Sequence, residues 1–268
     1  MSAVSDVMTF LNQLAPLPLA EDWDNVGLLL GNRASQASRI MTCLTLTPDV
    51  AAEAIEKQAD LIVTHHPILF RPVNKLTADS VEGSMVLQLI SAGISVYSPH
   101  TSYDSAQAGI NRQLAELLEL KNINVLRPQE VQSSDATPEP LGAGRFGDLA
   151  EPVSLENLNN RVKQALGISH LQYVGQSNSQ IKRVGIACGS AVEFLPDAVQ
   201  AGCDVLLTGE ARFHALLEAR AEGIALILPG HYATERPAME TLAKTLEKQF
   251  NQLTVWASEQ ETDPLCWD

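Results

Sequence analysis

TCLTLTPDVAAEAIEKQADLIVTHH, residues 42–66, is the stretch that decides the fold. The apolar run at residues 39–46 predicts a strand, and Thr47-Pro48 predicts the start of a helix, with threonine as the N-cap and proline in the first turn. Residues 60–64 (DLIVT) then predict a short buried strand that ends at a histidine pair. This order favours parallel pairing through a right-handed crossover, so the pattern predicts an α/β fold.

The second half of the chain repeats this pattern. Residues 185–210 (GIACGSAVEFLPDAVQAGCDVLLTGE) also run from a strand through a helix to an aspartate, an apolar strand and a threonine. Each copy is followed by Gly-Ile, an apolar strand, a proline and a histidine, in GISVYSPH at 93–100 and GIALILPGH at 223–231. One such likeness arises readily by chance, but two in the same order favour an ancient duplication. We therefore predict two related α/β lobes that face each other across a cleft.

The extent of the lobes is predicted from the segment between the two copies. Residues 127–143 (RPQEVQSSDATPEPLGA) are rich in proline, serine, glutamine and glutamate, which is typical of a loop or a domain junction. We expect the first lobe to comprise residues 1–126 and to recruit the C-terminal segment 229–268. The second lobe is then expected to comprise residues 127–228.

Four of the six histidines come directly after predicted strands: His65, His66, His100 and His231. Ligands of open parallel sheets bind beyond the carboxyl ends of the strands, where these side chains are expected. An acidic residue follows two of the histidines after four positions: Asp104 after His100, and Glu235 after His231. Imidazole with carboxylate is a ligand set that suits zinc, manganese, iron or nickel.

Each of these residues also has an ordinary structural interpretation. One histidine of the pair can pack in the core while its neighbour lies at the surface, since side chains alternate along a strand. Asp104 can cap the helix that begins near Ser105, and Glu235 can lie in the first turn of a helix, where the helix dipole favours an acid. These positions are compatible with metal binding too, and either carboxylate could bridge two ions ~3.5–4 Å apart, as in two-metal hydrolases.

Three further side chains are candidates for orientation or proton transfer. His100 could bind metal, or it could orient Asp104 or a water molecule from outside the metal's ligand sphere. His214 and Glu210 follow the apolar strand of the second copy and could face the cleft. We take His100 and Glu210 as the candidates for catalytic proton transfer. His170 lies outside these patterns and is expected at the surface.

Composition restricts the classes of function. The chain has 268 residues, with 18 basic and 32 acidic side chains and a formal net charge of −14. An acidic excess of this size repels nucleic acids and anionic membranes. The sequence shows no apolar stretch of membrane-spanning length, no signal-peptide pattern and no Cys-x-x-Cys pair, so we expect a cytoplasmic protein. It also lacks the phosphate-binding P-loop and the Gly-x-Ser-x-Gly motif of serine hydrolases.

Together these motifs resemble the dinuclear-metal family of GTP cyclohydrolase I type 2 homologues, also called the Nif-three-like family. The resemblance covers nearly the whole chain and rests on WDNVGLLLG at 23–31, ADLIVTHHPILF at 59–70, SPHTSYD at 98–104, DVLLTGE at 204–210 and GHYATE at 230–235. It implies two α/β lobes with a two-metal site in the cleft, a homohexameric ring, and the short form of the family without an inserted domain. The metal ligands that it implies, with Glu235 as the bridge, are His65, His66, Asp104, His231 and Glu235.

We therefore expect a hydrolase that binds two divalent metal ions per chain, whether zinc, iron, manganese or nickel. Its expected substrate is a nucleotide or a similar small anionic molecule, attacked by a metal-activated water. The family name suggests hydrolytic opening of the guanine ring of GTP. Two alternatives remain open: a two-metal phosphoesterase that attacks phosphorus, and a non-enzymatic protein that stores or delivers metal or scaffolds a complex.

Overall fold

A computed structural model describes residues 2–129 and 141–266 and confirms the α/β class. The chain forms two compact units. Unit 1 contains Met1–Tyr103 and Ala238–Pro264, and unit 2 contains Asp104–Pro237 and Leu265–Asp268. Each unit is built around its own β-sheet.

The boundaries between the units differ from those expected from the sequence, which lay after residues 126 and 228. Strand β7 (Lys121–Asn124) pairs with β10 (Arg145–Ser154), and helix α5 (Ile110–Leu117) packs against β10, so the chain from Asp104 onward belongs to unit 2. Near the second boundary, Thr234 Oγ1 accepts a hydrogen bond from the Gly189 amide, which holds the start of the last helix in unit 2.

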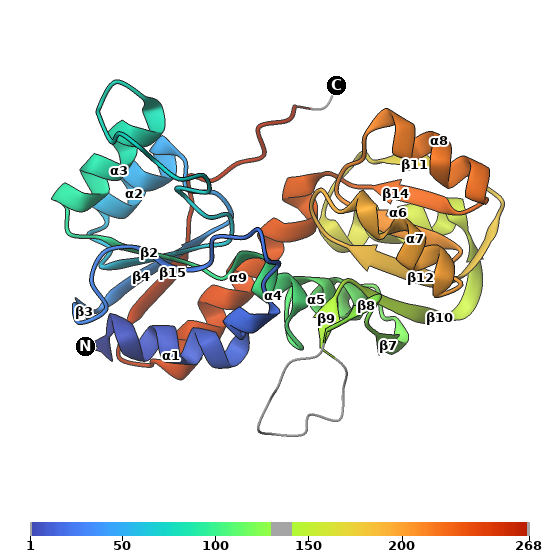
Figure 1. The fold of residues 1–268 in the computed structure, drawn as a ribbon. Helices are drawn as coiled ribbons and strands as arrows, with labels where there is room; N and C mark the ends of the chain where they lie inside the picture. Colours follow the sequence, from blue (N-terminus) through green and yellow to red (C-terminus); the bar gives the residue numbers. More distant parts are fainter. Residues whose placement is uncertain (1, 130–140, 267–268) are drawn as a thin grey trace. The chain divides into compact units, whose positions relative to one another are not determined.

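Unit 1 is built on a five-stranded sheet. Its strands, in spatial order, are β15 (Thr254–Ala257), β4 (Arg39–Cys43), β5 (Leu61–Thr64), β6 (Ser95–Ser98) and β2 (Gly27–Leu30). The first four run parallel, and β2 is antiparallel to β6 at the edge. Helices α2 (Pro48–Glu56) and α3 (Val81–Ser91) cover one face, whereas α1 (Val4–Leu14) and the later turns of α9 (His231–Gln249) cover the other (Figure 1).

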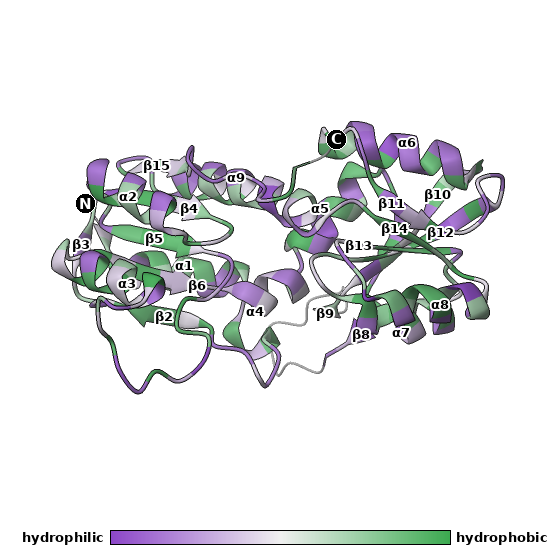
Figure 2. Ribbon diagram, turned by 90° about the horizontal axis from the view of Figure 1, so that it is seen from above, coloured by the Kyte–Doolittle hydropathy of each residue, from purple (hydrophilic) through white to green (hydrophobic). Residues whose placement is uncertain are grey.

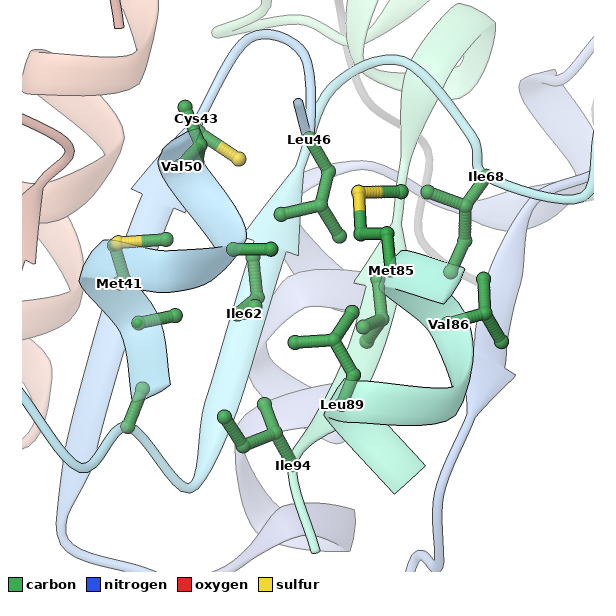
Figure 3. Close-up of a cluster of buried hydrophobic side chains, with 14 residues drawn as sticks. Met41, Cys43, Leu46, Val50, Ile62, Ile68, Met85, Val86, Leu89 and Ile94 are labelled. Atoms are coloured by element: carbon green, nitrogen blue, oxygen red, sulfur yellow. The ribbon is translucent and has the colours of Figure 1, made fainter. Parts of the chain in front are cut away.

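The main core of unit 1 lies between this sheet and helices α2 and α3. Figure 2 shows the strands as mainly hydrophobic and the helices as mixed, as expected for strands buried between helices. The apolar side chains that meet in this core are drawn in Figure 3 and include Met41, Leu46, Val50, Ile62, Ile68, Met85, Leu89 and Ile94. Complete burial of one such side chain contributes ~1.5–3 kcal/mol to the stability of the folded protein. Because Ile62 of β5 and Ile68 of the following loop both belong to this cluster, it holds the strand and the loop in place.

A buried glutamate joins α2 to the C-terminal segment of unit 1. The Glu53 carboxylate accepts hydrogen bonds from Lys57 Nζ, Trp256 Nε1, Ser258 Oγ and the backbone amides of Glu259 and Gln260. Burial alone would raise the pKa of Glu53, but these hydrogen bonds, above all those from Ser258 and Lys57, outweigh it and lower the pKa to about 2. The ionised carboxylate therefore anchors the chain beyond β15 against α2.

Unit 2 is built on a six-stranded sheet. Its strands, in spatial order, are β11 (Gln172–Val174), β14 (Ala225–Leu228), β13 (Val205–Thr208), β12 (Gln180–Ala187), β10 and β7. Strands β12, β13 and β14 run parallel, and the others pair in the antiparallel sense. Helices α5 and α6 (Leu155–Leu166) cover one face, and α7 (Leu195–Gln200) and α8 (Phe213–Glu222) cover the other (Figure 2).

The two sheets share one arrangement, as the duplicated sequence pattern predicts. Three parallel strands lie side by side in chain order, β4, β5 and β6 in unit 1 and β12, β13 and β14 in unit 2. An aspartate precedes the middle strand in both units, and its carboxylate accepts hydrogen bonds from backbone amides in or beside the first strand. Asp60 accepts from Ser38 and Arg39, and Asp204 accepts from Lys182 and Arg183. Equivalent strand ends therefore lie at the same edge of each sheet.

The remaining elements are short. Strand β1 (Ser2–Ala3) pairs with β3 (Gln36–Ala37), and β8 (Arg127–Pro128) pairs with β9 (Gly142–Ala143). Helix α4 spans His100–Ser105, and 3-10 turns lie at Leu17–Leu19 and Val192–Phe194. The loop expected at 127–143 thus begins and ends in a two-stranded ladder, and its residues 130–140 lie outside the described residues. Within the described ranges, no helix is both long enough and apolar enough to cross a membrane.

Candidate metal centre

Three histidine rings of unit 1 converge at the carboxyl ends of β5 and β6. His65 and His66 directly follow β5, and His100 begins α4 after β6. The ring centroids of His65 and His66 lie 5.2 Å apart, and that of His100 lies 5.2 Å from His65 and 5.7 Å from His66. One nitrogen of each ring lies within 4.8 Å of the others, so this cluster could hold a metal ion.

The histidine pair is held by backbone contacts that continue the parallel ladder beyond β5. The amides of His65 and His66 donate to the carbonyl oxygens of Cys43 and Leu44. Ser98 Oγ donates to the carbonyl oxygen of His65 at 2.6 Å. His65 is fully buried and His66 is half-buried, yet their rings are neighbours. The two rings therefore lie on the same side of the strand end, although they differ in burial.

Side chains around the cluster fix two of its rings. Thr45 Oγ1 lies 2.7 Å from His66 Nδ1, and Asp24 Oδ1 lies 2.8 Å from His100 Nδ1. A hydrogen-bond partner on one ring nitrogen selects the tautomer and the orientation of the imidazole. His100 itself has a positive φ of 29°, a conformation that is uncommon for residues other than glycine and is concentrated at functional sites.

Asp24 is a site residue that the sequence patterns did not single out. Its side chain is fully buried and also accepts hydrogen bonds from the amide and hydroxyl groups of Thr101. Burial by itself would raise the pKa of Asp24, but the hydrogen bonds with His100 and Thr101 outweigh it and lower the pKa. Its partner His100 lies 76 positions later, so no local pattern links the two residues. The one sequence signal for Asp24 is its place in the segment WDNVGLLLG.

A second group of donors gathers at the start of α9 in unit 2. His231 Nε2 lies 3.0 Å from Glu235 Oε2, one helical turn later, and His231 Nδ1 lies 3.2 Å from Glu210 Oε1. Glu235 is buried, whereas the Glu210 side chain is 56% exposed. The hydrogen bond with Glu235 raises the pKa of His231 to about 9 against the opposing effect of burial. This group combines the imidazole and carboxylate donors that metal sites use.

Glycines at the strand ends allow these side chains to approach closely. Gly189 has a φ of 66°, and a Cβ atom at this position would collide with the Glu235 carboxylate. A Cβ atom at Gly209 would lie 2.8 Å from His231 Cα. Thr234 Oγ1 accepts a hydrogen bond from Gly189 N and donates one to the carbonyl oxygen of His231. This close packing leaves no room for a side chain at residues 189 and 209, which follow β12 and β13, and so accounts for glycine at both positions.

Asp104 lies beside a buried thiol in unit 2. Cys188 Sγ is 3.4 Å from Asp104 Oδ1. The Asn111 side chain connects the two residues, because it donates to the carbonyl oxygen of Asp104 and accepts from the amide of Cys188. Burial raises the pKa of Cys188 well above its usual range, and the nearby carboxylates of Asp104 and Glu235 raise it further.

The two remaining histidines lie apart from both groups of donors. His214 is exposed on α8, and its ring centroid lies 5.9 Å from that of Phe213. His170 is also exposed, with Nδ1 2.8 Å from Ser169 Oγ. Neither residue joins the clusters that could hold a metal ion in the described part of the chain.

Comparison with known proteins points to one family. The model of the family Duf34/NIF3 (NGG1p interacting factor 3) matches residues 2–264. A Clostridium acetobutylicum protein named GTP cyclohydrolase 1 type 2 homolog is 34% identical over 97% of each chain. NIF3-like protein 1 of Drosophila melanogaster is 32% identical, over 97% of this chain and 87% of its own. The crystal structure of Staphylococcus aureus protein SA1388 has a TM-score of 0.89 at 31% identity and 99% coverage of both chains. A Bacillus cereus protein related to NIF3 shares the fold, with a TM-score of 0.92, 21% identity and coverage of 100% of this chain and 99% of its own.

Proposed function

Since the chain belongs to the Duf34/NIF3 family, we propose that it is a dinuclear metal-dependent hydrolase that acts on a nucleotide or a similar small anionic substrate. The observation that carries the proposal is the histidine cluster of unit 1, in which three imidazoles converge at strand ends. The ligands that we propose for the two ions are His65, His66, Asp104, His231 and Glu235.

The donor chemistry of both units fits such ions. Imidazole nitrogen and carboxylate oxygen are the ligands that zinc, iron, manganese and nickel share. In each unit the donors follow parallel strands at their carboxyl ends, where α/β proteins bind ligands. Helix α4 carries His100 of unit 1 and Asp104 of unit 2 four residues apart.

Bound at these side chains, the ions would supply a water of lowered pKa and positive charge opposite the negative charge that develops on the substrate. The protein's own groups orient the ligands and carry protons. Asp24 holds His100 in one orientation through the hydrogen bond to Nδ1. Glu210 is exposed and contacts His231 Nδ1, so it can exchange a proton with solvent beside the ligand set.

Metal analysis of the purified full-length protein, prepared without added metal, tests the ligand assignment. We expect close to two equivalents per chain in the wild type and a clear loss in His66→Ala and Glu235→Ala. His170→Ala is the matched control, because His170 is an exposed histidine outside both donor groups. A Glu235→Ala protein that binds metal and turns over substrate like the wild type would show that the assignment is wrong.

The products formed from GTP separate the possible reactions. Release of formate by the metal-loaded protein indicates opening of the guanine ring, whereas release of phosphate indicates a phosphoesterase. Absence of turnover across a panel of nucleotides would favour a role in metal storage, metal delivery or scaffolding. We also propose that the protein assembles into a homohexameric ring, and a solution mass of six chains by light scattering is the expected result.

A further inference from the structure

Two exposed aromatic side chains lie next to the histidine cluster of unit 1. Trp23 is 60% exposed and Phe70 is 46% exposed. Their ring centroids lie 6.0 Å apart in an edge-to-face arrangement. Both rings also contact His100, with centroid distances of 6.2 Å for Trp23 and 6.4 Å for Phe70. Large apolar groups that stay exposed together beside polar residues commonly mark a binding surface.

Hydrogen bonds hold this aromatic pair in position. Asn25 Nδ2 donates to the carbonyl oxygen of Leu69 at 3.0 Å and so ties the turn that carries Trp23 to the loop that carries Phe70. The Leu69 amide donates to Glu82 Oε1 at 3.2 Å, which attaches the same loop to α3. Leu69 has a positive φ of 53°, an uncommon conformation that directs the chain into Phe70. The exposure of the two rings is therefore built into anchored segments.

The loop that carries Phe70 is basic, although the chain as a whole is acidic. Between His66 and Asp79 the sequence contains Arg71 and Lys75 and no acidic residue, whereas the net charge of the chain is −14. Both basic side chains are exposed. The loop after Phe70 thus offers positive charge to an anion, and the aromatic pair offers an apolar ring face to a flat molecule, whereas Trp23 itself has Asp22 and Asp24 as chain neighbours.

We propose that Trp23 and Phe70 bind the planar heteroaromatic ring of the substrate, one of them by stacking on its face and the other, which is nearly perpendicular, along its edge. They would thereby select a purine nucleotide or a similar aromatic anion over an aliphatic phosphate. This role rests on the proposed function, and it adds the residues that determine the substrate class. Stacking on an aromatic side chain binds a base through its π face and requires no hydrogen-bond pattern. Contact of both rings with His100 places the stacked ring beside the proposed ligands.

The test compares a nucleotide with its counterpart that lacks the ring. Metal-loaded full-length protein is titrated calorimetrically with guanosine monophosphate and with ribose 5-phosphate. We expect Trp23→Ala and Phe70→Ala to weaken binding of guanosine monophosphate about tenfold or more, the usual loss when one base-stacking aromatic is removed. Binding of ribose 5-phosphate should not change, and Trp23→Phe should keep most of the nucleotide affinity. Tyr173→Ala is the control, because Tyr173 is as exposed as Phe70 but lies on β11 in unit 2.

Metal content, measured on the same samples, distinguishes this role from the proposed function. A selective loss of nucleotide binding at unchanged metal content supports the stacking role. The proposal is overturned if Trp23→Ala binds the nucleotide as tightly as the wild type, or if it loses both probes equally. It is also overturned if the wild type binds the two probes with equal affinity. A wild type that takes up no metal would contradict the proposed function, and the same two titrations of that metal-free protein would still decide the role of Trp23, because stacking does not require the ions.

Discussion

Replacement of the buried Glu53 by glutamine should destabilise the protein by about 3 kcal/mol near pH 7. The wild-type carboxylate accepts hydrogen bonds from Ser258, Trp256 and the amides of Glu259 and Gln260, and its side chain is only 3% exposed. Glutamine has the same size, but one of its terminal atoms is a donor, so one of these amides would lose its acceptor. A tenfold change in proton affinity corresponds to about 1.4 kcal/mol. Lowering the pKa of Glu53 from 4.5 to about 2 therefore corresponds to the loss of about 3 kcal/mol that we expect.

The contribution of Glu53 should depend on pH. Because the pKa is lower in the folded than in the unfolded protein, the stabilisation is present above the unfolded value of 4.5 and is lost as the pH falls from there toward about 2. The wild type should lose this part of its stability in that range. The Glu53→Gln variant has no carboxylate at this position, so the difference between the two proteins should shrink as the pH falls.

Urea unfolding followed by circular dichroism, at neutral pH and at several acidic values, measures both effects. Glu56→Gln is the matched control, since Glu56 lies on the same helix but is exposed. The reasoning would be refuted if Glu53→Gln unfolded within about 0.5 kcal/mol of the wild type at neutral pH, which is the range of ordinary surface substitutions. A difference that stayed constant down to about pH 3 would refute the assignment of the effect to the ionised carboxylate.

Three further outcomes concern the candidate metal centre. Asp24→Asn keeps the size of the side chain but removes the carboxylate that orients His100, the proposed proton-transfer group, so turnover of GTP should fall by about 10- to 100-fold while metal content and the circular dichroism spectrum are retained. Gly189→Ala should lower Tm by several degrees in thermal unfolding, because its Cβ meets the Glu235 carboxylate; Gly202→Ala, which has a similar φ of 69° but no neighbour within 4 Å, should lower Tm less. Removal of metal with a chelator should also lower Tm, and metal added back should restore it, since a ligand that binds only the folded state stabilises it.

The repeated strand–helix–strand units were predictable because their signals are local. The apolar run at 60–64 and the Thr47-Pro48 pair predicted β5 and α2 closely, and the structure has them at Leu61–Thr64 and Pro48–Glu56. The placement of histidines after strands also depends on local order, so the convergence of His65, His66 and His100 followed from the α/β topology.

Contacts between distant segments left no comparable signal. Asp24 binds a residue 76 positions later, and Glu53 binds residues more than 200 positions later, where the sequence shows only ordinary polar side chains. The unit boundary moved for a similar reason. Strand β7 is exposed and polar, and only its antiparallel pairing with β10 assigns it to unit 2. A sequence shows periodicity along the chain, but it does not show which carboxylate will accept a hydrogen bond from a given buried amide.

The division of unit 1 between the two ends of the chain has a consequence for biosynthesis. The ribosome releases residues 1–103 first, yet β15, the edge strand beside β4, and the groups that bind Glu53 are made last. Residues 104–237 are continuous and can complete their six-stranded sheet while the earlier-made sheet still has an open edge. Open sheet edges pair readily with other chains, so we expect the nascent protein to be most prone to aggregation until β15 has emerged and paired with β4. The part of the protein that is synthesised first is thus the part that finishes folding last.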